Sequence, residues 1–331
     1  MEKCIVHSWS DNKYKVVTIH ESIPDDLYIS CISYEPRSLG LLKKLDKNYK
    51  AEVGVFIMNE RFERFKKVKS NKKEIDRFLE KTSFFNHRND ILASIDNPIK
   101  ILIEVDKIIK QQFGKKQRIN ITFDITTFAR SELLTLIYYL RHLPTIDTIR
   151  IVYVSPIKYG DWLSEGYLYS MVPPFFEGSP TFEKKTALLI LAGFEYDRAV
   201  SLIEDLEPSA LIIGRPHPGT ASEFEDFGET IIQKLRRTRK IQTHLYDIPA
   251  NNPFRCRDFL RNSIQEHLQE YNFFVAPMGT KLEVFGAYLA YEKDQNFRMI
   301  YPVTQIYNVG SYSSGCRDVY EVFLSNVNNK K

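Results

Sequence analysis

A short segment, Pro277-Met-Gly-Thr-Lys281, joins residue types that can hold an anion. It follows an apolar run and precedes an apolar helical stretch. Glycine lets the backbone approach a ligand, threonine can cap the helix and bond a phosphate oxygen, and lysine supplies charge. Free N–H groups at a helix start add positive potential. The upstream glycine of a Walker A loop is missing, and an ordinary capped helix explains the segment as well as a phosphate site does.

A second segment, Asp124-Ile-Thr-Thr-Phe-Ala-Arg130, occupies the matching place in the first half of the chain. It too follows an apolar run and opens an apolar helical stretch. Asp124 could orient a ribose hydroxyl or cap the helix, and the sequence leaves both readings open.

The elements that position these segments alternate along the chain. Near-continuous apolar runs indicate buried parallel strands, and runs with three- and four-residue spacing indicate helices. The expected strands are 27–34, 51–58, 120–124, 148–154, 186–192, 210–214, 243–248, 272–276 and 297–302. The expected helices are 38–44, 63–82, 91–113, 131–143, 196–206, 227–236, 257–271 and 282–293. This alternation predicts an α/β protein with mainly parallel sheets flanked by helices.

The order of these elements repeats after about 160 residues. Segment 29–37 runs from an apolar stretch into a helix, and segment 188–198 does the same. We therefore predict two tandem Rossmann-like domains related by a pseudo-twofold axis, at residues 1–170 and 185–331, with a linker at 171–184. Chance similarity of two open α/β sheets is the alternative.

In an open parallel sheet, ligands bind outside the carboxyl ends of the strands. The ligand-binding candidates in the loops there are Tyr34, Glu35, Arg37, Asp124, Thr126, Thr127, Arg130, Glu195, Arg198, Asn251, Gly279, Thr280 and Lys281. Tyr159 and Tyr307, at strand ends, could stack on bases or pack at the rim. Glu35 and Glu195 could do acid–base work as a pair, but a salt bridge with Arg37 or Arg198 is the favoured role. No catalytic residue is assigned.

Bulk composition excludes several classes of protein. Net charge is +4 over 331 residues, which disfavours a duplex-DNA binder with a dominant basic stripe. Apolar runs are too short for a membrane span, and no secretory signal opens the chain. The four cysteines are scattered and the seven histidines lack metal-ligand spacing, so we expect a cytoplasmic protein with reduced thiols, no metal and no cofactor.

Both loop segments carry a resemblance. Pro277-Met-Gly-Thr-Lys281 is similar to the Thr-Gly-Gly-Thr-Lys loop of CRISPR-associated Rossmann-fold (CARF) sensor domains. Asp124-Ile-Thr-Thr-Phe-Ala-Arg130 resembles the Asp-x-Thr-His-Gly-x-Arg loop of another branch. The sequence departs from these patterns at Pro277 and Met278, and at Thr127 and Phe128. The match covers the two loops and the alternation around them, about a sixth of the chain.

The resemblance implies a cytoplasmic antiviral sensor. Such domains pair around a cyclic oligonucleotide second messenger, and two fused copies are the arrangement of the related SAVED sensors. An effector would then be a separate protein. Some relatives cleave their ligand without metal, using the ribose 2′-hydroxyl, with charge stabilisation that Lys281 and Arg130 could supply. The alternatives are therefore a ring-nuclease-type enzyme, or one that processes another nucleotide, and a protein-interaction subunit with a vestigial cleft.

Overall fold

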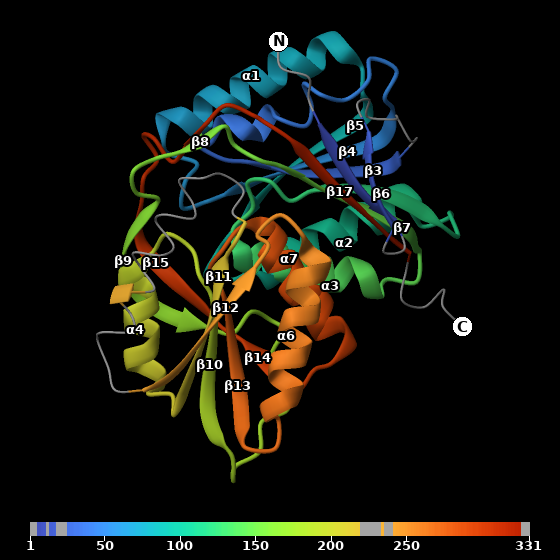
Figure 1. Ribbon diagram of the computed structural model, residues 1–331. Coiled ribbons are helices and arrows are strands. Elements are labelled where there is room, and N and C mark those ends of the chain that lie inside the picture. Colours follow the sequence, from blue (N-terminus) through green and yellow to red (C-terminus); the bar gives the residue numbers. More distant parts are fainter. Residues whose placement is uncertain (1–4, 11–12, 18–24, 219–232, 235–240, 326–331) are drawn as a thin grey trace. The chain divides into compact units, whose positions relative to one another are not determined.

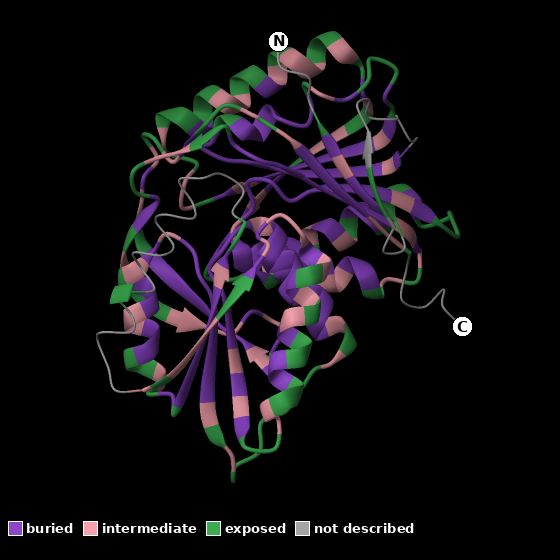
Figure 2. Cartoon of the chain, in the orientation of Figure 1, coloured by how far each residue is buried: buried purple, intermediate pink, exposed green. Residues whose placement is uncertain are grey.

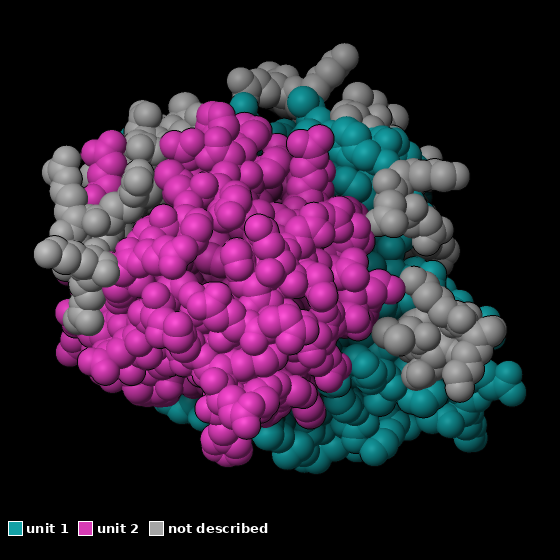
Figure 3. Space-filling view, turned by 60° about the horizontal axis from the view of Figure 1, so that its bottom comes forward, with its two compact units in different colours: residues 1–159, 309–331 teal, residues 160–308 magenta. Residues whose placement is uncertain are grey.

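The computed structural model divides into two compact units, coloured separately in Figure 3. Unit 1 comprises residues 1–159 and 309–331, and unit 2 comprises residues 160–308. The structure describes residues 5–10, 13–17, 25–218, 233–234 and 241–325. Unit 2 is thus contiguous in sequence, and unit 1 is made from the segments on either side of it.

Unit 1 contains a mainly parallel sheet whose strands follow the order β5-β4-β3-β6-β7 (Figure 1). Their bounds are β3 (Asp25–Ile32), β4 (Ala51–Asn59), β5 (Phe85–Ala93), β6 (Ile119–Asp124) and β7 (Ile146–Val154). The order reverses at β3, which lies between β4 and β6. This is the topological switch point beside which open α/β sheets bind ligands.

The sheet of unit 1 continues beyond β7 with strands from both ends of the chain. β17 (Val319–Ser325) runs antiparallel to β7, and β1 (Val6–Ser10) lies parallel to β17 with β2 (Lys13–Val17) outside it. A short pair, β8 (Lys158–Tyr159) with β16 (Ser313–Ser314), extends the antiparallel ribbon.

Helices cover both faces of this sheet. Figure 1 shows α1 (Lys66–Thr82) on one side, and α2 (Ile99–Phe113) and α3 (Arg130–His142) on the other. The central strands β3, β4 and β6 are buried at all but one or two positions each (Figure 2). Because both faces are covered, these strands read as continuous apolar runs in the sequence.

Unit 2 has a parallel sheet with the order β12-β11-β10-β13-β14. Its strands are β10 (Lys185–Leu191), β11 (Ala210–Pro216), β12 (Gln242–Ile248), β13 (Tyr271–Pro277) and β14 (Phe297–Met299). β15 (Tyr301–Tyr307) begins two residues after β14 ends and pairs antiparallel with β9 (Ser164–Met171). The order β12-β11-β10-β13-β14 matches the order β5-β4-β3-β6-β7 of unit 1, and the separate antiparallel pair of β15 with β9 corresponds to that of β7 with β17.

The helices of unit 2 are α4 (Tyr196–Leu206), α6 (Pro253–His267) and α7 (Lys281–Lys293). α4 packs through Ala199 and Leu202 against the sheet face that carries Leu188 and Ile190. α6 begins at Pro253 because the Asn252 side chain accepts hydrogen bonds from two backbone N–H groups of its first turn.

The predicted α/β class is confirmed, and so are most of the expected strands and helices. Two predicted helices need correction. Residues 91–93 end the edge strand β5 rather than starting a helix, and segment 38–44 is the end of a 3₁₀ helix (Pro36–Leu39) followed by turns. The strands 164–171 and 319–325 were not predicted. The predicted helix 227–236 lies outside the described residues, except for 233–234, which are helical.

The units also differ from the predicted domains in their bounds. Residues 160–170 belong to unit 2, and residues 309–331 belong to unit 1. None of the helices in the described part of the chain has the length and apolar character that crossing a membrane requires.

Candidate functional site

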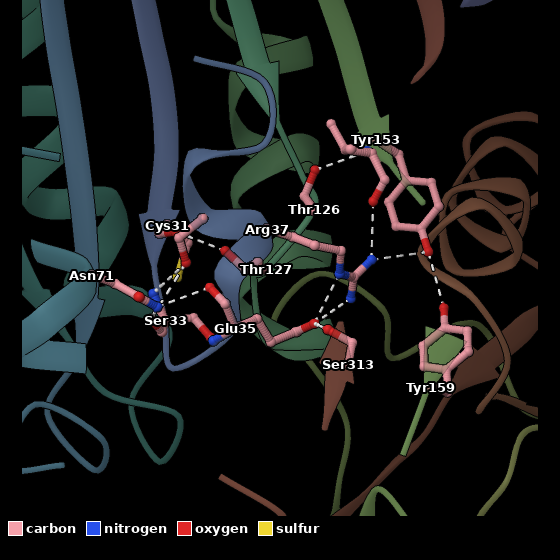
Figure 4. Close-up of polar contacts among 12 residues, drawn as sticks. Cys31, Ser33, Glu35, Arg37, Asn71, Thr126, Thr127, Tyr153, Tyr159 and Ser313 are labelled. Atoms are coloured by element: carbon pink, nitrogen blue, oxygen red, sulfur yellow. Dashed lines mark hydrogen bonds and ion pairs between the residues drawn. The ribbon is translucent and has the colours of Figure 1, made fainter. Parts of the chain in front are cut away.

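The loop after β3 in unit 1 carries a buried ion pair. Arg37 Nε donates to Glu35 Oε2 at 2.9 Å, and Nη2 donates to the same oxygen. Arg37 Nη1 donates to the Val154 carbonyl at 3.0 Å, and the Ser313 hydroxyl donates to Glu35 Oε2 at 2.7 Å. Glu35 and Arg37 are only 4% and 2% exposed. The favoured salt-bridge role is therefore confirmed for Glu35, whose negative charge is paired with Arg37 inside unit 1 (Figure 4).

Two tyrosines complete this group, as Figure 4 shows. The Arg37 guanidinium carbon lies over the Tyr153 ring, 5.7 Å from the ring centre. Arg37 Nη1 also donates a hydrogen bond to the Tyr153 hydroxyl at 3.3 Å. This hydroxyl is 3.1 Å from that of Tyr159. We call Glu35, Arg37, Tyr153, Tyr159 and Ser313 the unit-1 cluster. Burial lowers the pKa of Arg37, but the charge and hydrogen bond of Glu35 together with Tyr153 and Tyr159 outweigh it and raise this pKa, so the arginine stays charged.

The loop after β6 in unit 1 is held by its own polar side chains. Asp124 Oδ1 accepts hydrogen bonds from the Thr126 N–H at 3.0 Å and from the Thr126 hydroxyl. Thr126 Oγ1 in turn accepts from the Val154 N–H at 3.0 Å, and the Thr127 hydroxyl donates to the Cys31 carbonyl at 2.6 Å. Asp124 thus shapes a turn and does not cap α3. Burial raises the pKa of the Asp124 carboxyl to about 6, against these hydrogen bonds.

The start of α3 follows this turn. Its N-cap is Ala129, whose N–H donates to Glu132 at 3.3 Å, and Glu132 also accepts from the Asn59 amide at 2.6 Å. Arg130, the first helical residue, is 9% exposed. Tyr34, another candidate, is 6% exposed and packs edge-on against Phe62. The candidates of unit 1 therefore lie at one edge of the sheet, mostly with buried side chains.

The loop after β10 in unit 2 carries a similar ion pair. Arg198 Nη1 lies 2.8 Å from Glu195 Oε1, and the Ser164 hydroxyl donates to that oxygen at 2.7 Å. Arg198 Nη2 donates to the Pro302 carbonyl. The arginine lies over the Tyr301 ring at 5.4 Å. The favoured salt-bridge role is confirmed for Glu195 as well.

The hydroxyl of Tyr301 lies 3.2 Å from that of Tyr307. We call Glu195, Arg198, Tyr301, Tyr307 and Ser164 the unit-2 cluster. Its members match those of the unit-1 cluster in type and in partner. The serines of both clusters were missed by sequence reasoning, although each begins a Ser-x-Gly triplet, at 164–166 and 313–315.

The loop after β13 in unit 2 forms the capped helix start that the sequence predicted. Thr280 is the N-cap of α7: its hydroxyl oxygen accepts from the Glu283 N–H at 3.3 Å, and Glu283 accepts from the Thr280 N–H at 2.7 Å. The hydroxyl also donates to the Ala250 carbonyl at 2.9 Å. A Cβ on Gly279 would lie 2.2 Å from Glu283 Oε2, so this capping contact requires glycine. Lys281 follows and is partly exposed.

Two backbones meet in unit 2 where its strand order reverses. A Cβ on Gly193, in the loop after β10, would lie 2.1 Å from the Met278 carbonyl oxygen in the loop after β13. Asn251, the remaining candidate, is partly exposed in the turn before α6. The described residues contain no group of three His, Cys, Asp or Glu side chains that could hold a metal ion.

Comparisons with known proteins support the fold rather than an activity. No protein-family model matches the sequence, and no curated protein matches it. Among solved structures, the chain is similar to a Type III CRISPR defence DNA nuclease activated by cyclic oligoadenylate, with a TM-score of 0.53 and 10% sequence identity. The likeness covers 83% of this chain and 64% of the nuclease chain, so about a third of the nuclease lies outside it.

Two other solved structures are far less similar. They are the cytoplasmic domain of a prokaryotic cation chloride cotransporter, at a TM-score of 0.25, and a keto acid-selecting NRPS module, at 0.23, each 10% identical. The chain therefore shares its fold with the CRISPR defence nuclease, and this agrees with the CARF-like fold that the two loop segments predict.

Proposed function

We propose that this protein is a sensor that binds a cyclic oligonucleotide second messenger. One combination of features carries the proposal: a capped Gly279-Thr280-Lys281 helix start beside a switch point, in a fold shared with a nuclease activated by cyclic oligoadenylate. The N–H groups at the start of α7 and the Lys281 ammonium provide positive potential for a phosphate. In unit 1, Arg130 occupies the matching position at the start of α3.

Calorimetric titration with cyclic tri-, tetra- and hexa-adenylate tests the proposal. We expect at least one ring to bind, and Lys281→Ala to weaken that binding at least tenfold, which corresponds to about 1.4 kcal/mol. Lys293→Ala is the matched control, because this exposed lysine ends the same helix. The melting temperature of both variants without ligand should equal that of the wild type. If no ring binds, or both lysine variants bind like the wild type, the proposed site is wrong.

We propose sensing rather than ligand cleavage. Glu35 and Glu195, the acids considered for proton transfer, are each buried in an ion pair with an arginine. A buried, paired carboxylate is poorly suited to accept a proton from a ligand. Chromatography of a cyclic oligoadenylate after prolonged incubation with the protein should recover the intact ring, and linear products would favour the ring-nuclease alternative.

The output of such a sensor would be delivered by a separate effector in antiviral defence. We also propose that the two units are copies of one ancestral unit, as in the SAVED-like arrangement. The same strand order and the matching unit-1 and unit-2 clusters support this duplication.

A further inference from the structure

The strands that end the two halves of the sequence pair in an unexpected way. Tyr159 ends β8, and the next strand along the chain, β9, begins at Ser164. Yet Tyr159 lies opposite Ser313 in unit 1, whereas Ser164 lies opposite Tyr307 in unit 2. Each half therefore continues into a strand that pairs with a strand from the other half of the sequence: β9 with β15, and β16 with β8.

The two exchanged segments match in backbone detail. Two residues after each serine comes a glycine with positive φ, 70° at Gly166 and 67° at Gly315. A Cβ on Gly166 would lie 2.9 Å from the Cβ of Gln305, and one on Gly315 would lie 3.1 Å from that of Ile157. Gln305 comes two residues before Tyr307, which lies opposite Ser164. Ile157 likewise comes two residues before Tyr159, which lies opposite Ser313. The two pairings are thus the same interaction made twice.

Each exchanged segment also contributes to a buried charge. The Ser313 hydroxyl donates to Glu35, and the Ser164 hydroxyl donates to Glu195, both at 2.7 Å. Buried carboxylates require such hydrogen bonds, because desolvation otherwise destabilises the charged form. The serine of one half thereby fixes the glutamate in the first loop of the other half.

An unexchanged chain would make the same contacts by another route. Tyr159 could face Ser164 across a hairpin loop of residues 160–163, and Tyr307 could face Ser313 across residues 308–312. Loops of four or five residues commonly close hairpins. Exchange of equivalent elements keeps the serine–tyrosine and serine–glutamate contacts, as exchange of identical elements between protomers does at little cost in energy.

We propose that the two halves reciprocally exchange their final strand, and that Ser164 and Ser313 are positioning residues, each of which holds the Glu–Arg pair of the half to which it does not belong. This proposal is independent of the ligand, since it concerns only the pairing of strands within each unit. It makes the loop beside each switch point depend on a strand from the other half.

Four double-cysteine variants of the full chain, in a Cys316→Ser background, distinguish the two arrangements. All four positions are exposed; Lys158 lies opposite Ser314, and Glu165 lies opposite Ile306. Exchange predicts disulfides in Lys158→Cys with Ser314→Cys and in Glu165→Cys with Ile306→Cys. The hairpin arrangement predicts them in Lys158→Cys with Glu165→Cys and in Ile306→Cys with Ser314→Cys.

Peptide mapping after mild oxidation identifies the bonded pairs, and gel mobility shows that they lie within one chain. We expect the two exchanged pairs to form and the two hairpin pairs to stay reduced. Formation of either hairpin pair, or failure of both exchanged pairs, overturns the proposal.

Hydrogen exchange tests the positioning role. Ser313→Ala should speed amide exchange several-fold around Glu35 and leave the segment around Glu195 unchanged, and Ser164→Ala should do the reverse. If each variant instead loosens the loop of its own half, or neither variant changes exchange, then these serines do not position the glutamates across the halves.

Discussion

The two units share a supporting cluster but differ in the loops beside it. In both, a buried glutamate and arginine are joined by two tyrosines and a serine. The loop after β6 is closed by Asp124, whereas Pro277 ends the matching strand β13 and Thr280 caps the helix that follows. The difference teaches that buried charge constrains the supporting cluster, while the loops beside it can diverge.

Removing one glutamate from each cluster gives the largest expected effect. Glu35→Ala and Glu195→Ala should each destabilise their unit by about 3–5 kcal/mol, because an arginine stays buried without its partner. Hydrogen exchange resolved by unit measures both losses. Glu165→Ala, at an exposed position, is the control. Unequal losses, with one variant close to the wild type, would break the equivalence of the clusters.

A pH titration should reveal a contribution of Asp124 in unit 1 that the matching position of unit 2, Pro277, lacks. The folded pKa of Asp124, about 6, is raised above its unfolded value, so its contribution to stability is fully present below about pH 4 and is lost as pH rises through about 6. The loss is about 3 kcal/mol, the free energy that corresponds to this rise of the pKa. Asp124→Asn should abolish this dependence.

Hydrogen exchange of unit 1 at several pH values, compared between wild type and Asp124→Asn, measures the effect. Unit 2 is the internal control, because Pro277 occupies the matching strand end. A stability difference between the two proteins that stays constant from pH 4 to 7 would contradict the prediction.

The contact between neighbouring loops gives the smallest expected effect. Gly193→Ala should destabilise unit 2 by about 1–3 kcal/mol, since its Cβ would meet a backbone carbonyl that cannot move aside cheaply. In unit 1 the loops are joined instead by the hydrogen bond from Thr127 to Cys31, and Thr127→Val should cost about 1 kcal/mol. Urea denaturation followed by hydrogen exchange measures the loss of stability in each variant. A larger loss for Thr127→Val than for Gly193→Ala would contradict the expected order.

Much of the fold could be predicted because burial leaves a direct trace in the sequence. The strands around Leu188 and Ile29 are apolar on both faces, and the helix 196–206 has clear helical spacing. β5 was missed because it is an edge strand with polar, partly exposed residues. The segment after Pro36 forms a 3₁₀ helix, and Gly40 lies close to the Cys316 side chain from the far end of the chain, which no local pattern records.

The site could be predicted in part, for a related reason. Adjacent charges such as Glu35 and Arg37 indicate an ion pair, and Gly279-Thr280-Lys281 indicates a capped helix start. The partners Ser164 and Ser313 could not be assigned, because either serine fits either tyrosine equally well. Sequence reports which contacts can form, but it does not report which of two equivalent segments makes them.

The split of unit 1 around unit 2 has a consequence for biosynthesis. All residues of unit 2 leave the ribosome before β17, the strand that completes the central sheet of unit 1. Because synthesis proceeds at about 5–20 residues per second, the sheet edge beside β7 stays unpaired for on the order of 10 s. The part of the protein that is made first is therefore the part that finishes folding last.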